Sequence, residues 1–258
     1  MICWYTKDHF RGNGLQKTVT IIKWMILASL LVTAFVNCDG FELANTLNDE
    51  LESGSSDVVS SDNCVLAPAQ YRNPKGIDEV TSLINVLPKP LSIPCLIENL
   101  PQPLKVYSFE STGSAQPSVD SNNPRIFIFV NNLIVSVTPK GIGRELVEFS
   151  QVISSTESVK GEIKFPVVSE LDVAAPYDSI RESFGTSCRV CHLGERSVSG
   201  FAGEAYASPI LRPGSAGRQT ALKMKLQTAS CDDSDDPSRC KMLRSIFKNG
   251  NAQDANFP

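Results

Sequence analysis

The residues best suited to chemistry form one short motif, Cys188-Arg189-Val190-Cys191-His192. Its two thiols are separated by two residues, and an imidazole follows the second thiol directly. One turn of chain between the cysteines lets each thiol add to one of the two vinyl groups of a porphyrin, and His192 is then placed under the iron as an axial ligand. The spacing therefore predicts one covalently bound haem c as the cofactor.

The motif and the residues before it resemble the c-type cytochromes over 184–192. Phe184 lies four residues before Cys188, where small members of that family often carry an aromatic side chain. Ile180 departs from the pattern, since a glycine is common there. The resemblance implies covalent haem at Cys188 and Cys191, His192 as the proximal ligand, and electron transfer to an unknown redox partner rather than catalysis by side chains. The order of an exported β-rich region, the motif and a final helix resembles uncharacterised bacterial lipoproteins, and this resemblance implies no function.

The second axial ligand of such a haem can be narrowed by elimination. The chain has two histidines, and His9 lies in the N-terminal targeting segment, so a second histidine of the mature chain is excluded. A thioether is the next available iron ligand, but Met1 and Met25 lie in the same segment. Met242 and Met224 remain as the candidates. Simple packing in the core is the alternative for both, and it would leave an open iron site or a different ligand.

Other chemistries compete for the same cysteines. Cys188 and Cys191 can form structural disulfides, either alone or with Cys231 and Cys240, and the protein is then a structural or binding lipoprotein without haem. A zinc site can combine the pair with two of His192, Cys231 and Cys240, although its spacers are irregular. A thioredoxin-like redox pair needs a surrounding βαβ pattern, which the sequence lacks.

Four further cysteines make two pairs once the motif and the N-terminal segment are set aside. Cys64 and Cys95 flank a predicted helix, whereas Cys231 and Cys240 flank a polar loop. Disulfides persist in the oxidising compartments that exported proteins enter. We therefore predict Cys64–Cys95 and Cys231–Cys240 bridges, each of which stabilises the fold by about 3 kcal/mol in a chain-entropy model.

The first 63 residues have the composition of a targeting segment followed by a tether. Residues 24–36 are uncharged and mostly apolar, which suits a signal peptide and is short for a membrane span. We therefore predict a signal peptide over 1–37. Cys38 follows it and resembles the lipid-anchored cysteine of bacterial lipoproteins. Residues 38–63 predict an acidic flexible tether, since they contain seven acidic residues and no Lys or Arg.

These features predict an exported protein on the periplasmic side of a membrane, held there by a lipid on Cys38 or by the N-terminal segment. Plain secretion without an anchor is the alternative. Four of the 24 basic and one of the 28 acidic residues precede Cys38, so the remainder carries a net charge of −7. Nucleic acid is excluded as a partner, because phosphate binding requires clusters of Lys and Arg.

The fold class predicted for the rest is α+β, with an antiparallel β-rich region before a helical one. Residues 64–175 are the expected β-rich domain. It begins with a helix in which Ile77, Val80 and Ile84 share one face. Strands follow, and Asn131-Asn132 predicts the two-residue turn of a hairpin.

Residues 176–258 predict a small, loop-rich and helical region. Glycine and proline are frequent in its first half, and two helices are expected over 219–229 and 237–249. Asp236 is the expected N-cap of the second, with Pro237 in its first position. The resemblance implies that this region is cytochrome-c-like and holds the haem.

The expected acylation of Cys38 predicts that Cys38→Ser releases the protein from membranes, because the variant lacks the only thiol at the start of the mature chain. Membrane fractionation and the intact mass measure this effect, with the wild type as the control. A wild type that carries no lipid mass, together with a variant that stays bound, would contradict the prediction.

Overall fold

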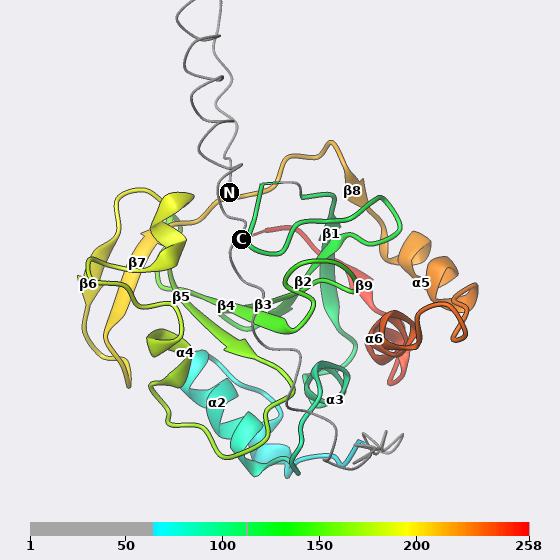
Figure 1. The fold of residues 1–258 in the computed structure, drawn as a ribbon, viewed down its shortest axis with the longest axis horizontal. Helices are drawn as coiled ribbons and strands as arrows, with labels where there is room; N and C mark the ends of the chain where they lie inside the picture. The colour runs from blue at the N-terminus through cyan, green and yellow to red at the C-terminus, as the bar shows by residue number, and fades with distance from the viewer. Residues whose placement is uncertain (1–63, 112, 258) are drawn as a thin grey trace, which may run out of the picture. The chain divides into compact units, whose positions relative to one another are not determined.

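A nine-stranded, mostly antiparallel sheet organises the residues that the computed structural model describes, 64–111 and 113–257 (Figure 1). Its strands are β1 (Lys105–Phe109), β2 (Arg125–Val130), β3 (Leu133–Val137), β4 (Leu146–Val152), β5 (Glu157–Lys164), β6 (Arg196–Val198), β7 (Ala205–Pro209), β8 (Arg218–Gln219) and β9 (Gln253–Asp254). They run in the order β6-β7-β5-β4-β3-β2-β1-β8, and β9 pairs with β1 in parallel. The predicted α+β class with a β-rich core is confirmed.

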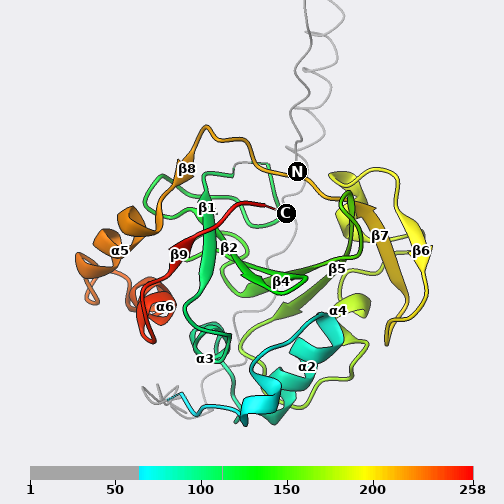
Figure 2. The same cartoon turned by 180° about the vertical axis from the view of Figure 1, so that it is seen from behind.

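Five α-helices and two short 3-10 helices accompany this sheet in the described residues. They are η1 (Ala69–Tyr71), α2 (Ile77–Val86), α3 (Ile93–Glu98), α4 (Ala175–Asp178), η2 (Ser187–Val190), α5 (Ala221–Ala229) and α6 (Pro237–Phe247). Both views show α5 and α6 beside β1, at the opposite end of the sheet from β6 and β7 (Figures 1 and 2).

The predicted hairpin is formed by β2 and β3. Val130 pairs with Leu133, so Asn131 and Asn132 make a two-residue turn. Asn131 has a φ of 52°, a backbone conformation that asparagine adopts at a lower cost than most side chains. The turn therefore sets the register of the two strands at the centre of the sheet.

The early helix is also confirmed, as α2. Ile77, Val80 and Ile84 are fully buried on its inner face, as their spacing predicted. The helix begins beside β4, because the Ile77 amide donates a hydrogen bond of 2.9 Å to Oε1 of Gln151. This contact satisfies one of the amides that lack a partner within the first helical turn.

Alternation along the strands gives the sheet two different faces. Ile126, Ile128, Val135 and Val147 point to one face and are fully buried with the apolar side chains of α2, α3, α5 and α6. The neighbouring residues in the strands, including Phe127, Ser136 and Glu148, point to the other face. One face therefore holds the hydrophobic core, and the other carries polar and aromatic side chains.

The residues after 176 form more than the helical region that we expected. Two helices lie close to the predicted ranges, and the side chain of Asp236 caps α6 by accepting a hydrogen bond of 3.0 Å from the Arg239 amide. The same part of the chain also contributes β6, β7, β8 and β9 to the sheet of the β-rich region. These strands have two to five residues, too few for their alternation to be recognised in the sequence.

The predicted signal peptide, the lipid anchor at Cys38 and the acidic tether lie outside the described residues. Among the helices of the described part, none combines the length and the apolar character needed to cross a bilayer.

The two-faced sheet predicts a large stability difference between two apolar truncations. Ile128→Ala is expected to lower the free energy of unfolding by about 2–5 kcal/mol, because Ile128 is 0% exposed in the core. Leu222→Ala is the control, since Leu222 is 67% exposed on α5, and it is expected to change stability by less than about 0.5 kcal/mol. Urea unfolding under non-reducing conditions measures both values. Equal losses would contradict the assignment of the core face.

Candidate functional site

The cysteine–histidine motif forms a single turn. The Thr186 hydroxyl accepts a hydrogen bond of 3.1 Å from the Cys188 amide and caps η2. The amides of Cys191 and His192 then both donate to the Cys188 carbonyl, at 3.1 and 2.9 Å. The two cysteines and the histidine are thereby held one turn apart, as the spacing predicted.

The carboxylate of Glu195, which no sequence pattern singles out, holds this turn in place. Glu195 accepts hydrogen bonds from the Thr186 amide at 2.9 Å and from the Thr186 hydroxyl at 2.5 Å. Gly185 makes this approach possible, because its φ is +82° and an added Cβ would lie 2.6 Å from a Glu195 oxygen. The segment from 185 to 195 is therefore a closed loop that presents the motif.

His192 is anchored through one ring nitrogen. Its Nδ1 lies 2.8 Å from the Pro209 carbonyl oxygen at the end of β7. A carbonyl accepts only, so Nδ1 carries the proton of this hydrogen bond. Burial, together with the charge of Lys160, lowers the pKa of His192 to about 4, so the ring is neutral at pH 7. Its Nε2 is then unprotonated, which is the form in which a histidine binds a metal.

A cavity of about 300 Å³ lies between the motif and the sheet face opposite the core. Cys188, Cys191 and His192 line one side of it. The sheet supplies aromatic and charged side chains on the other: Phe109, Phe127, Arg125, Glu148, Lys160 and Glu162. We call this cavity the motif pocket.

An ion pair crosses the charged wall of the motif pocket. Arg125 of β2 binds Oε2 of Glu148 on β4 and also donates to the hydroxyls of Ser136 and Ser114, each at 2.6 Å. The guanidinium therefore already has hydrogen-bond acceptors within the protein. The second oxygen of Glu148, Oε1, is buried and has no hydrogen-bond partner.

Burial changes the acid–base behaviour of three other groups in the motif pocket. It lowers the pKa of Lys160 to about 8 and raises the pKa of Glu162 to about 7. It also raises the pKa of the Cys188 thiol to about 11, with a further contribution from Glu148. A thiol that stays protonated at pH 7 is a poor nucleophile for disulfide exchange, which argues against a thioredoxin-like pair.

The two candidate methionine ligands lie on the other side of the sheet. Sδ of Met224 is 3.9 Å from the hydroxyl of Ser108, and both residues are buried on the core face. Met242 is buried in the same core cluster. Neither side chain lines the motif pocket, so the structure does not bring either methionine to His192. The apolar faces of α5 and α6 direct these side chains into the core.

The other cysteines pair as predicted. Cys64 is bonded to Cys95, and Cys231 is bonded to Cys240. Cys188 and Cys191 are thiols, so the disulfides do not join the motif to the C-terminal pair. The zinc site considered above loses Cys231 and Cys240 as possible ligands, because they are bonded to each other. In the described residues, no group of three or more His, Cys, Asp and Glu side chains is arranged to hold a metal ion.

Two residues that precede the motif differ in burial. Phe184 is 78% exposed and does not pack on the motif turn as an aromatic support would. Ile180 is buried and lines the motif pocket. No sequence pattern singles out Thr186, Glu195 or Pro209, because they act through tertiary contacts.

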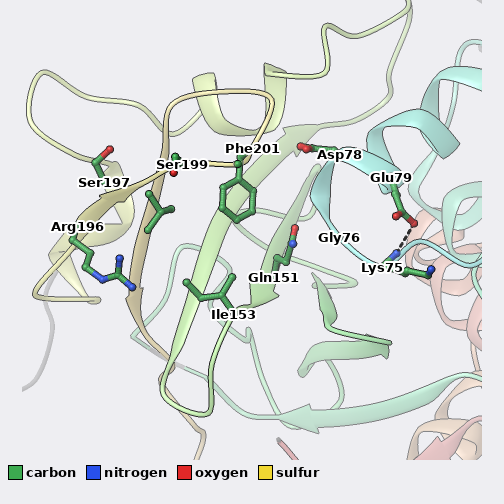
Figure 3. Close-up of a pocket in the computed structure, with 12 residues that line it drawn as sticks. Lys75, Gly76, Asp78, Glu79, Gln151, Ile153, Arg196, Ser197, Ser199 and Phe201 are labelled. Carbon is green, nitrogen blue, oxygen red and sulfur yellow. Dashed lines mark hydrogen bonds between the residues drawn. The ribbon is translucent and has the colours of Figure 1, made fainter.

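A second hollow, of about 620 Å³, lies between the start of α2 and the strands β4 and β6 (Figure 3). Three of its charged side chains already have partners. Glu79 accepts a hydrogen bond of 2.9 Å from the Lys75 amide, Asp78 accepts one from the Tyr177 hydroxyl, and Arg196 pairs with Glu157. No motif residue lines this hollow, so the motif pocket is the better candidate for chemistry.

Comparisons with known proteins add no relatives: no protein-family model matches the chain, and the searches of curated proteins and of solved structures give no match.

The raised pKa of Glu162 predicts a pH-dependent stability. In the unfolded chain the carboxyl titrates near the usual value of about 4.3, whereas in the folded protein its pKa is about 7. The folded state therefore holds the extra proton, and the contribution of Glu162 to stability is lost as the pH rises from about 4 through about 7.

Glu162→Gln is expected to remove this loss, so the variant gains stability relative to the wild type between pH 5 and pH 8. Urea unfolding at the two pH values measures the difference. Glu145→Gln is the control, because Glu145 is an exposed carboxylate beside Lys164. If Glu162→Gln and Glu145→Gln respond alike, the burial of Glu162 has no such effect.

Proposed function

We propose that this chain is an exported haem protein that transfers electrons. Cys188 and Cys191 would hold one haem c through two thioether bonds, and His192 would be the proximal ligand of its iron. The observation that carries the proposal is the geometry of the motif. One turn faces the pocket with both thiols and with an imidazole whose other nitrogen is already bonded.

The environment of His192 supports this assignment. A histidine that binds a metal through one nitrogen usually donates its other N–H to a carboxylate or a backbone carbonyl, which fixes the ring orientation. The Pro209 carbonyl has this position relative to Nδ1. The low pKa of His192 also keeps the imidazole neutral at pH 7, so no proton has to leave before a metal is bound.

The state of the cysteines supports covalent attachment. Thioether formation adds an S–H group across a vinyl double bond, so sulfur bonds to one carbon, hydrogen to the other, and no oxidant is required. It does require thiols, and Cys188 and Cys191 are thiols, whereas the other four described cysteines are paired in disulfides. The donor set of the motif pocket, two thiols and one imidazole, therefore fits haem c.

When bound, the haem iron would supply reversible one-electron redox chemistry, and the residues of the pocket would set its potential. Phe109 and Phe127 would limit the access of water, and the charges of Arg125, Glu148 and Lys160 would influence the bound haem. Because Met224 and Met242 lie on the core face of the sheet, we propose no methionine ligand. This replaces the thioether ligation that the sequence suggested.

The proposed location is the periplasmic side of a membrane, with a lipid on Cys38 or the N-terminal segment as the anchor. The two disulfides of the described part support export, because such bonds persist in oxidising compartments. The redox partner is a protein or small molecule that the proposal does not name.

A binding protein without haem is the second candidate. The pocket supports it, because the sheet face alone supplies aromatic and charged side chains. Cys188 and Cys191 would then be structural.

The experiment for the haem proposal uses full-length protein made in a host with c-type haem maturation. The intact mass is expected to increase by one haem, and a pyridine haemochrome spectrum is expected to show two thioether bonds. Cys188→Ser and Cys191→Ser should each change that spectrum to the single-thioether form. A wild type without the added mass would refute the proposal and favour the binding protein.

Methionine variants distinguish ligation from packing in the same preparation. Met224→Ala and Met242→Ala are expected to leave the visible spectrum unchanged and to lower the free energy of unfolding by about 2–5 kcal/mol. His192→Ala is expected to change the spectrum and to retain the covalent haem.

A further inference from the structure

Two polar groups in the motif pocket still have hydrogen-bonding capacity, and they face the same space. Lys160 and Glu148 lie on adjacent strands and point away from the core, toward the pocket that they both line. Neither residue belongs to the cysteine–histidine motif, and neither would be a ligand of the proposed haem.

Lys160 has one donor in excess. Its ammonium group has three N–H donors. One is directed to the hydroxyl of Ser158 and another to that of Ser150, at 3.4 Å. In the part of the chain that the structure describes, Lys160 forms no ion pair with a carboxylate. Burial lowers the pKa of Lys160 to about 8, so an anion in contact with the ammonium would stabilise its charged form.

Glu148 has one acceptor in excess. Its Oε2 accepts from Arg125, but its buried Oε1 has no partner. Glu162 lies directly opposite on β5, and no hydrogen bond joins the two carboxyl groups. A buried polar atom left without a partner costs about 1–3 kcal/mol, so a group that donates to this oxygen would bind favourably.

The same pocket also has an aromatic wall, over β1 and β2. Phe109, Phe127 and Phe257 line the same pocket, and the rings of Phe127 and Phe257 are 5.0 Å apart in an edge-to-face arrangement. Pockets for small molecules commonly combine such an apolar wall with a few directed polar groups, and a volume of about 300 Å³ is at the lower end of their range.

We propose that the motif pocket binds a small molecule that has an apolar body, a carboxylate and a hydrogen-bond donor, as an aromatic amino acid does. The carboxylate pairs with Lys160, the donor group binds Oε1 of Glu148, and the apolar body lies against the phenylalanine rings. The inference rests on the second candidate function, a binding protein without haem, because a haem at Cys188 and Cys191 would lie against the same side chains.

The test titrates the full-length protein, made without haem maturation, with three probes in a calorimeter. L-Phenylalanine has both polar groups, 3-phenylpropionate lacks the amine, and 2-phenylethylamine lacks the carboxylate. L-Phenylalanine is expected to bind at least about tenfold more tightly than either analogue, since each missing group leaves a buried partner unpaired. Equal affinity for all three probes, or no binding at millimolar concentration, would overturn the proposal. In that case, water or a protonated Glu162 would satisfy the Glu148 oxygen.

Two variants assign the contacts. Lys160→Met is expected to remove the preference for L-phenylalanine over 2-phenylethylamine. Glu148→Gln can keep the bond to Arg125 and replaces the free acceptor by an amide donor, so it should remove the preference over 3-phenylpropionate. Lys164→Met is the control, because Lys164 is on the same strand with its side chain 74% exposed. Preferences that survive in both pocket variants would overturn the assignment.

The probe comparison on the wild type remains decisive if a variant does not fold, which circular dichroism detects. Haem content is measured on separate, maturation-competent preparations. Failure of the haem proposal and failure of this inference are therefore distinguishable.

Discussion

The alternation of side chains across the ladder from β1 to β5 is the constraint on which the other features depend. Every second residue of these strands enters the apolar core with the helices, so the residues between them must face the other way. That second face carries the ion pair of Arg125 and Glu148. The motif loop lies across it, and this arrangement creates a pocket with charged groups on a rigid floor.

The same constraint explains which expectations from the sequence were correct. The hairpin turn at Asn131, the helix α2 and the cap at Asp236 depend on residues close together in the chain, so their signals are local. The two disulfides followed from counting cysteines. The placement of the two methionines on the core face of the sheet has no local signal, because the face on which a helix packs is a tertiary property. Met224 has the chemistry of a ligand but lies behind the sheet.

The parts of the site that the sequence did not reveal are contacts between distant segments. Pro209 binds His192 through a backbone carbonyl, which any residue possesses, so its identity carries no signal. In the sequence, nothing distinguishes Glu195 from the other acidic residues, because its contact with Thr186 forms only when the loop folds. Lys160 and Glu148 lie on two different strands, β5 and β4, at positions that face away from the core. Only the register between these strands places both at one pocket. The strands β6 to β9 are too short to be recognised without the sheet that they join.

The pairing of β1 with β8 and β9 has a consequence for synthesis of the protein. Lys105 and Val106 meet Gln253 and Asp254, which follow them by more than half of the chain. A ribosome therefore releases β1 to β5 long before the partners of this edge exist, and the nascent sheet has an open row of amides and carbonyls for that time. Such an edge can pair with other chains, and contacts between distant residues form slowly. A chaperone that covers this edge, or a delay in sheet formation, would therefore protect the chain from wrong pairing until β8 and β9 have been synthesised.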